Sequence, residues 1–254
     1  MKIYFIFFAI ALLKCMPASA LQVKQEMQTS IGFFDACSQT LTYSFYHDKD
    51  YDIKTSVHTT GTFGTLYPFK AEYHAVGTYD KTGFKPQNYF YETTAPFKHK
   101  TKEITYKNGI PQRRISTKNE EVKVVNLEPD PKYASSIDLL SVFAMLAQKV
   151  VSKGECDLDM YSYNGKRYSR SVVKSKGKEK IKTPYFSGRA MKCEYRLENT
   201  KHADAGFLLD KDVPVYFWIL RDKETDAPFI AKIEVESTPF GKLESITTKV
   251  EVKK

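Results

Sequence analysis

The side chains that could carry out catalysis are scattered along this sequence. No G-x-S-x-G turn, which would expose a serine nucleophile, is present. The histidines are widely spaced: His47, His58, His74, His99 and His202. No two of them have the H-E-x-x-H spacing that places two zinc ligands on one helix face, and His58 and His74, which fall in neighbouring expected strands, are interpreted as polar strand positions. We therefore expect no catalytic residue, no metal site and no cofactor, and we interpret the protein as not an enzyme.

Three aspartates alternate at the end of an expected hairpin. Asp48, Asp50 and Asp52 would present their carboxylates on one side, and calcium prefers such oxygen ligands. The calcium-loop pattern, however, requires glycine where Ile53 stands and glutamate where Thr59 stands. We interpret the three aspartates as a solvated turn.

A run of alternating lysines could contact an anionic surface. Its members are Lys174, Lys176, Lys178, Lys180 and Lys182. Near an anionic membrane each lysine contributes about 1 kcal/mol, and the formal net charge of the chain is +9. For an exported protein, lipid headgroups, lipopolysaccharide or cell-wall polymers are the expected anionic partners, and nucleic acid is not. The alternative is that the run is a mobile solvated loop and that the charge only keeps the protein soluble.

The cysteines predict one disulfide. Cys156 and Cys193 each lie in a strand-like run and close a loop that holds the lysine run. A disulfide is the default expectation in an oxidising compartment, and this one would stabilise the fold by roughly 4 kcal/mol. Cys37 is left over as a buried thiol, an exposed reactive thiol or the true partner of either other cysteine.

The first twenty residues are typical of a cleaved secretory signal. Lys2 precedes an apolar run at 3–13 that is too short to span a bilayer, and a small-x-small pattern ends at Ala20. Cys15 suggests a lipoprotein, but Lys14 stands where a lipidation motif needs a small residue. We expect residues 21–254 to form a single exported β-rich domain, with no membrane-spanning segment.

One strong helix is predicted, from about Ser136 to Ser152. Ser135 could cap its beginning, and Gly154 could take the left-handed conformation at its end. Apolar residues cover well over half of its circumference, so it must be mostly buried.

The rest of the chain alternates with the period of a β-strand. Asn108-Gly109 and Asn164-Gly165 predict hairpins, whereas residues 21–38 have no clear period and residues 61–68 are interpreted as a bend. We count roughly a dozen strands with short connections, which predicts an antiparallel meander that twist curls into an open barrel or half-barrel. The single apolar helix should pack against the concave side of this sheet.

Several segments together resemble a known family. They are residues 59–92, IDLLSVFAMLAQ at 137–148, the two cysteine-bearing segments, and the PFIAKIEVES–FGKLESI tail. Their order and spacing are similar to the envelope proteins called domain of unknown function 3108, over most of residues 40–252. The resemblance implies a β-rich periplasmic protein of a Gram-negative bacterium, and it transfers no catalytic residue.

The abundance of aromatic residues indicates a hydrophobic cleft. The chain has 17 Tyr, 17 Phe and 1 Trp, and a curled sheet that holds an apolar helix can enclose such a cleft. We expect it to be lined by Phe143, Leu146, Phe217 and Trp218. The sequence thus favours a non-enzymatic envelope protein that binds a lipid, a lipoprotein or another hydrophobic molecule. The alternatives are a structural protein with a filled core that contacts other envelope proteins, and an enzyme acting on envelope polymers.

Overall fold

The structure is a computed structural model that describes residues 20–46, 49–80, 83–128, 136–199, 213–222 and 225–253. The predicted leader up to residue 19, the predicted cap Ser135, and His47, Asp48 and His202 lie outside these residues.

Fourteen strands in the described ranges form one antiparallel sheet. In chain order they are β1 Ala20–Ile31, β2 Phe34–Tyr46, β3 Asp50–Thr59, β4 Lys70–Asp80, β5 Gly83–Ala95, β6 Lys98–Lys107, β7 Ile110–Lys118, β8 Glu121–Asn126, β9 Leu158–Tyr163, β10 Tyr168–Lys182, β11 Ser187–Asn199, β12 Val215–Arg221, β13 Pro228–Thr238 and β14 Gly241–Lys253. Their order across the sheet is β8-β7-β6-β5-β4-β3-β2-β1-β14-β13-β12-β11-β10-β9. Strands that follow one another in the chain are therefore neighbours, except β8 and β9, which form the two edges, and β1 pairs with β14 to join the two halves.

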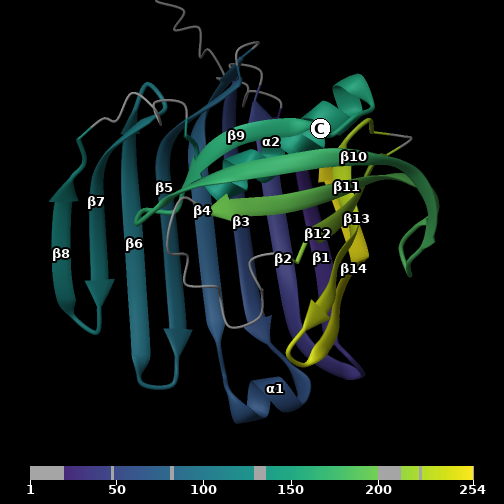
Figure 1. The fold of residues 1–254 in the computed structure, drawn as a ribbon, viewed down its shortest axis with the longest axis horizontal. Coiled ribbons are helices and arrows are strands. Elements are labelled where there is room, and N and C mark those ends of the chain that lie inside the picture. Colours follow the sequence, from purple (N-terminus) through teal and green to yellow (C-terminus); the bar gives the residue numbers. More distant parts are fainter. Residues whose placement is uncertain are drawn as a thin grey trace, which may run out of the picture.

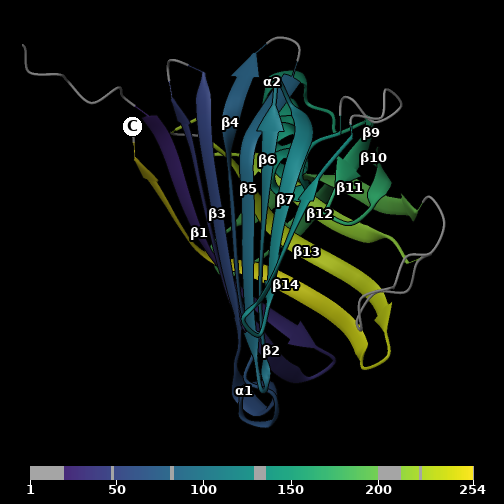
Figure 2. The same cartoon turned by 90° about the vertical axis from the view of Figure 1, so that its left-hand side faces the viewer.

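The sheet curls so that β9, β10 and β11 pass in front of β2, β3 and β4 (Figure 1). Figure 2 shows the two walls that result, with β3–β7 running steeply and β9–β14 crossing them obliquely. Side chains bridge the open seam. Lys102 Nζ donates to Asn164 O at 2.9 Å, and Arg114 Nη1 donates to Gly165 O at 2.6 Å. The predicted curled antiparallel meander is confirmed.

Helix α2 (Leu139–Lys153) lies inside the curl, against β3, β4, β5, β9, β12 and β13. It begins three residues later than predicted because Asp138 is its N-cap, with a side chain that accepts from Ser141 N at 2.9 Å. Gly154 ends it in the left-handed conformation, at φ 71°, as predicted.

Two segments differ from the sequence-based expectation near the start of the chain. Residues 21–31, for which no period was recognised, belong to β1, where every second residue is buried: Val23, Gln25, Met27, Thr29 and Ile31. The expected bend after β3 contains a short helix, α1 (Gly61–Leu66), so the structure has two helices where one was predicted. The N-cap residue of this helix, Thr60, is joined to strand β2, because Thr60 N donates to Ala36 O at 2.9 Å.

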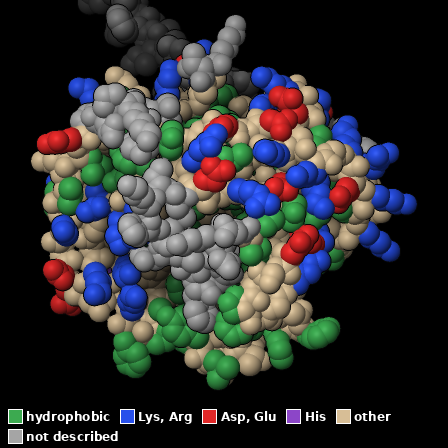
Figure 3. All heavy atoms as spheres, in the orientation of Figure 1, with side chains coloured by type: hydrophobic (Ala, Val, Ile, Leu, Met, Phe, Trp, Pro, Cys, Tyr) green, Lys and Arg blue, Asp and Glu red, His purple; other side chains and the backbone are tan. Residues whose placement is uncertain are grey.

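The lysine run is a strand and not a loop. All five lysines lie on β10, whose last half pairs with β11 beyond a bulge between Ser175 and Lys178. Main-chain pairing holds this stretch in place although it carries few apolar side chains. Figure 3 shows basic side chains projecting on the side of the molecule where this hairpin lies.

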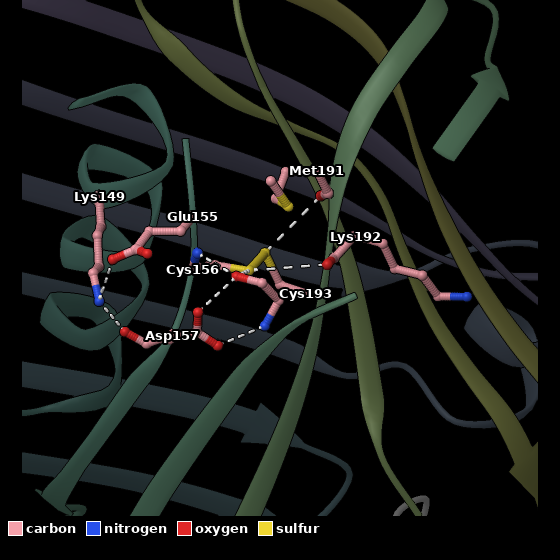
Figure 4. The surroundings of a disulfide bond; sticks show 8 residues. Lys149, Glu155, Cys156, Asp157, Met191, Lys192 and Cys193 are labelled. Atoms are coloured by element: carbon pink, nitrogen blue, oxygen red, sulfur yellow. Dashed lines mark hydrogen bonds and ion pairs between the residues drawn. A yellow bond between two sulfur atoms is a disulfide. The ribbon is translucent and has the colours of Figure 1, made fainter. Parts of the chain in front are cut away.

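A disulfide joins Cys156, which follows α2, to Cys193 on β11, as predicted. Both cysteines are fully buried. Ser175 on β10 supports the bridge, because its hydroxyl accepts from Cys156 N at 2.8 Å. Figure 4 shows the bridge between Cys156 and Cys193, with the ion pair of Lys149 and Glu155 beside it. The disulfide therefore fixes the end of α2 to strand β11. Cys37 is the free cysteine among the described residues and lies half-buried on β2, where burial raises the pKa of its thiol.

Candidate hydrophobic ligand site

An apolar cavity of about 290 Å³ lies between α2 and the concave face of the sheet. Ligand pockets typically start near 300 Å³, and an engineered cavity of about 150 Å³ holds benzene. Its wall consists of Gln25, Gln39, Leu41, Tyr43, Phe45, Ile53, Thr55, Val57, Tyr73, Tyr89, Leu139, Leu140, Phe143, Ala144, Ala147, Phe217, Phe229, Ile230 and Ile233. The volume is therefore sufficient for a small apolar molecule or part of a larger one.

The period of two in the strands aims alternate side chains into this space. On β2 these are Leu41, Tyr43 and Phe45, and on β3 they are Ile53, Thr55 and Val57. The sequence analysis recognised the period of two along most of the chain, but it did not choose these residues as lining. The alternation of residues 41–45 was the signal that could have identified them.

The helix side of the wall explains why the space is not filled. Ala144 and Ala147 lie on the face of α2 that lines the cavity, and their side chains are small. Phe143, beside them, makes ring contacts with Phe217 at 5.1 Å and Tyr195 at 5.8 Å. Longer side chains at the two alanines would reach into the cavity.

Polar groups in the wall are uncharged. Burial raises the pKa of the Tyr43 and Tyr89 hydroxyls well above their usual value, so both remain protonated. Among the described residues no partner reaches the buried Tyr43 hydroxyl.

Asp138 lies next to this site but does not line it. Burial raises the pKa of its carboxyl to about 6, and hydrogen bonds from Ser141 partly oppose the increase. Its Oδ2 accepts from the Ser141 hydroxyl at 2.7 Å, and that hydroxyl is 2.7 Å from the Tyr51 hydroxyl. The carboxyl thus anchors the start of α2 to β3.

The four residues that we expected to line a cleft have different positions. Phe143 and Phe217 lie in the cavity wall. Leu146 is buried in the cluster around the disulfide, and it is not part of the wall. Trp218 needs a correction, because it follows Phe217 on the same strand and must face the other side of the sheet.

On that other face the Trp218 ring is covered by charged side chains. Its Nε1 donates to Glu179 Oε2 at 3.1 Å, and the ammonium groups of Lys192 and Lys232 lie 5.0 and 4.8 Å from the ring centre. These cation–π contacts keep the indole buried outside the curl.

The lysine run faces away from the cavity, and all five side chains are exposed. Lys176 pairs with Glu194 at 2.7 Å. Lys178 lines a second, wider groove of about 900 Å³ at the end of α2, together with Arg189 and Arg221.

The residues considered as metal ligands do not converge. His74 Nε2 is 3.1 Å from Asp52 Oδ1, whereas His58 lies opposite Lys70, four positions along the same ladder. Within the described ranges, no three histidine, cysteine or acidic side chains form a group that could hold a metal ion.

The same ranges contain no helix that combines the length and apolar character needed to cross a bilayer.

Comparisons with known proteins agree with this architecture. A crystal structure described as a beta-barrel-like protein of domain of unknown function DUF1849, from Brucella abortus, is similar with a TM-score of 0.54 and 7% sequence identity. The match covers 93% of this chain and 99% of that chain, and at this identity it shows the fold alone. No curated protein matches the sequence. The family described as "Protein of unknown function (DUF3108)" matches residues 28–244. The chain therefore belongs to the DUF3108 family, as its sequence resemblance predicted.

Proposed function

We propose that this protein is a non-enzymatic protein of the periplasmic cell envelope that binds a lipid or another hydrophobic molecule. The observation that carries the proposal is the apolar cavity between α2 and the concave face of the sheet. A fully packed core would favour a purely structural role, because protein interiors normally leave few voids larger than a water molecule.

The chemistry of the wall supports a neutral, apolar ligand or ligand segment. Aromatic and aliphatic side chains dominate the wall, and its described residues include no carboxylate, imidazole or amine. A charged group placed there would lose its hydration without gaining an ionic partner.

The proposed compartment rests on separate observations. Residues 1–20 have the pattern of a secretory signal. The Cys156–Cys193 disulfide is typical of proteins that fold under oxidising conditions. Both favour an extracytoplasmic location, and the periplasm is the one that we propose.

Native mass spectrometry of the protein, purified gently from a bacterial periplasm, tests the binding role. We expect an added mass that organic solvent releases and that is identified as a lipid. The substitution Ala144→Leu should reduce the fraction of the protein that carries this added mass, because the larger side chain fills the cavity. Ser152→Leu, which places the same side chain on the exposed side of the same helix, should leave it unchanged.

A protein that carries no added mass, and that takes up no fatty acid or phospholipid when these are offered, would contradict the binding role. The search would then turn to protein partners in the envelope.

A further inference from the structure

Exposed hydrophobic side chains gather at one end of the curled sheet. Nine large hydrophobic residues are exposed in the described ranges. Five of them lie in the connections β1–β2, β3–β4, β5–β6 and β13–β14, and a sixth, Phe34, begins β2. These connections share one end because neighbouring strands are antiparallel. We call this group the apolar rim: Phe33, Phe34, Leu66, Tyr67, Phe97 and Phe240.

Three of the four connections are in direct contact. Gly32 N donates to Lys242 O at 2.8 Å, which joins the β1–β2 and β13–β14 turns. The rings of Phe63 on α1 and Phe240 lie 6.4 Å apart. The β5–β6 turn lies farther along the same end (Figure 1), and Figure 3 shows hydrophobic side chains along this lower edge of the molecule. The rim is therefore one surface and not a set of unrelated loop residues.

The opposite end of the same strands has a different character. Its described turn residues include Lys49, Asp80, Lys107 and Asn108, all exposed. One of the nine exposed hydrophobic residues lies there, Tyr185 in the β10–β11 turn, and its ring packs against Phe229 at the start of β13.

The shape and chemistry of the rim fit a lipid bilayer. Phe33 and Phe97 have exposed fractions of 103% and 100%, so they project fully from their turns. Neither lines one of the two cavities described above. A protein partner would need a separate pocket for each projecting side chain, whereas the headgroup region of a bilayer accepts several aromatic side chains at one depth.

The charges near the rim are also compatible with a membrane. Residues 59–69, which contain α1, include no charged side chain. Lys70, Lys98 and Lys242 follow three of the connections, and their long side chains can reach lipid phosphates while their stems cover apolar surface. Lys70 and Lys242 already pair with Glu72 and Glu234, so we expect binding to depend only moderately on anionic lipid.

We propose that the apolar rim docks this protein on the surface of a phospholipid bilayer, with its aromatic and leucine side chains in the headgroup region. The cavity wall approaches this end, since Val57 lies three residues before Thr60, about 10 Å along β3. A docked molecule would thus hold its cavity close to the lipid. Docking itself does not require the cavity to be occupied, so it is tested separately from ligand binding.

Vesicle flotation is the decisive experiment. The mature protein is mixed with vesicles of phosphatidylcholine, or of phosphatidylcholine with phosphatidylglycerol, and we expect it to float with both. The variant Phe33→Ser/Phe97→Ser should bind about tenfold more weakly for each side chain withdrawn from the interface. Val124→Ser, which removes an exposed apolar side chain from the middle of the edge strand β8, should bind like the wild type.

Failure of the wild type to bind either vesicle would overturn the proposal, as would unchanged binding of the double variant. Concentration-dependent self-association that the double variant abolishes, without vesicle binding, would instead assign the rim to contacts between copies of the chain. Both phenylalanines are fully exposed, so circular dichroism should show the double variant folded. The two single variants provide the same comparison if it is not.

Discussion

The carboxamide of Gln25 hydrogen-bonds both backbone polar groups of Ile230, which lies on a strand that is not adjacent to its own. Gln25 Nε2 donates to Ile230 O at 2.9 Å, and Ile230 N donates to Gln25 Oε1 at 3.2 Å. Strand β14 lies between β1 and β13, but its pairing with β13 extends only over residues 232–238 of β13. The buried Gln25 side chain therefore replaces a missing strand partner, in the wall of the cavity.

Replacing Gln25 by leucine should lower the free energy of unfolding by about 1–3 kcal/mol, because the buried N–H of Ile230 loses its acceptor. The carbonyl of Ile230 would keep its bond from the Thr247 hydroxyl. Urea unfolding measures the loss. Gln39→Leu is the matched control, since Gln39 also lines the cavity but donates to a side chain, Thr55 Oγ1. A loss as large for Gln39→Leu would show that the backbone contact of Gln25 has no special weight.

Removing the disulfide should destabilise the protein more than any other change of its cysteines. The double substitution Cys156→Ser/Cys193→Ser opens a loop with a sequence separation of 37, and we expect a loss of up to about 4 kcal/mol in the free energy of unfolding. Cys37→Ser changes a half-buried thiol on another strand and should cost less than about 1 kcal/mol. Equal melting temperatures for wild type and double variant would contradict the expectation.

Local patterns in the sequence were sufficient for much of the fold. The helix at α2 follows from the density of its apolar residues. The Asn108-Gly109 turn follows from the tolerance of Asn and Gly for positive φ values, and the structure gives these residues φ values of 54° and 77°. The disulfide follows from two cysteines in strand-like runs that close one loop.

The missed features depend on contacts that are distant in sequence. Strand β1 was hidden because Gln25 and Thr29 occupy two of its buried positions, and their burial makes sense only with β13 and β14 in place. The lysine run is a strand because β11 supplies its backbone partners.

The functional surfaces were harder to predict for the same reason. Adjacent residues such as Phe217 and Trp218 face opposite sides of a sheet, and the sequence does not show which side encloses the cavity. Phe33 and Phe97 are indistinguishable from core phenylalanines until their turns are placed at one end of the sheet.

Asp138 should make stability fall as the pH rises from about 4 to about 6. Its carboxyl has a pKa of about 6 in the fold, above the ordinary 3.8, because burial disfavours the charged form. In this interval the native state holds more protons than the unfolded state, so the contribution is complete below pH 4 and lost above pH 6. The variant Asp138→Asn can still cap the helix. Over this interval the unfolding free energy of the variant should fall by roughly 2–3 kcal/mol less than that of the wild type. Parallel pH profiles of the two proteins, measured by urea unfolding, would contradict this assignment.

Gly165→Ala should open the seam between the β9–β10 turn and strands β6 and β7. Gly165 has φ +83°, and an added Cβ would lie 2.3 Å from Lys102 Cδ and 2.9 Å from Ile104 Cδ1. We expect a loss of about 2–4 kcal/mol, of which 1–2 kcal/mol comes from the left-handed backbone and the rest from displaced side chains. Gly154→Ala is the matched control, because its φ is +71° with no atom within 4 Å of the added Cβ. The difference between the two variants in thermal unfolding isolates the packing at the seam. Equal losses would mean that Lys102 and Ile104 move aside freely, so that side-chain packing does not hold the edge strands of the curl together.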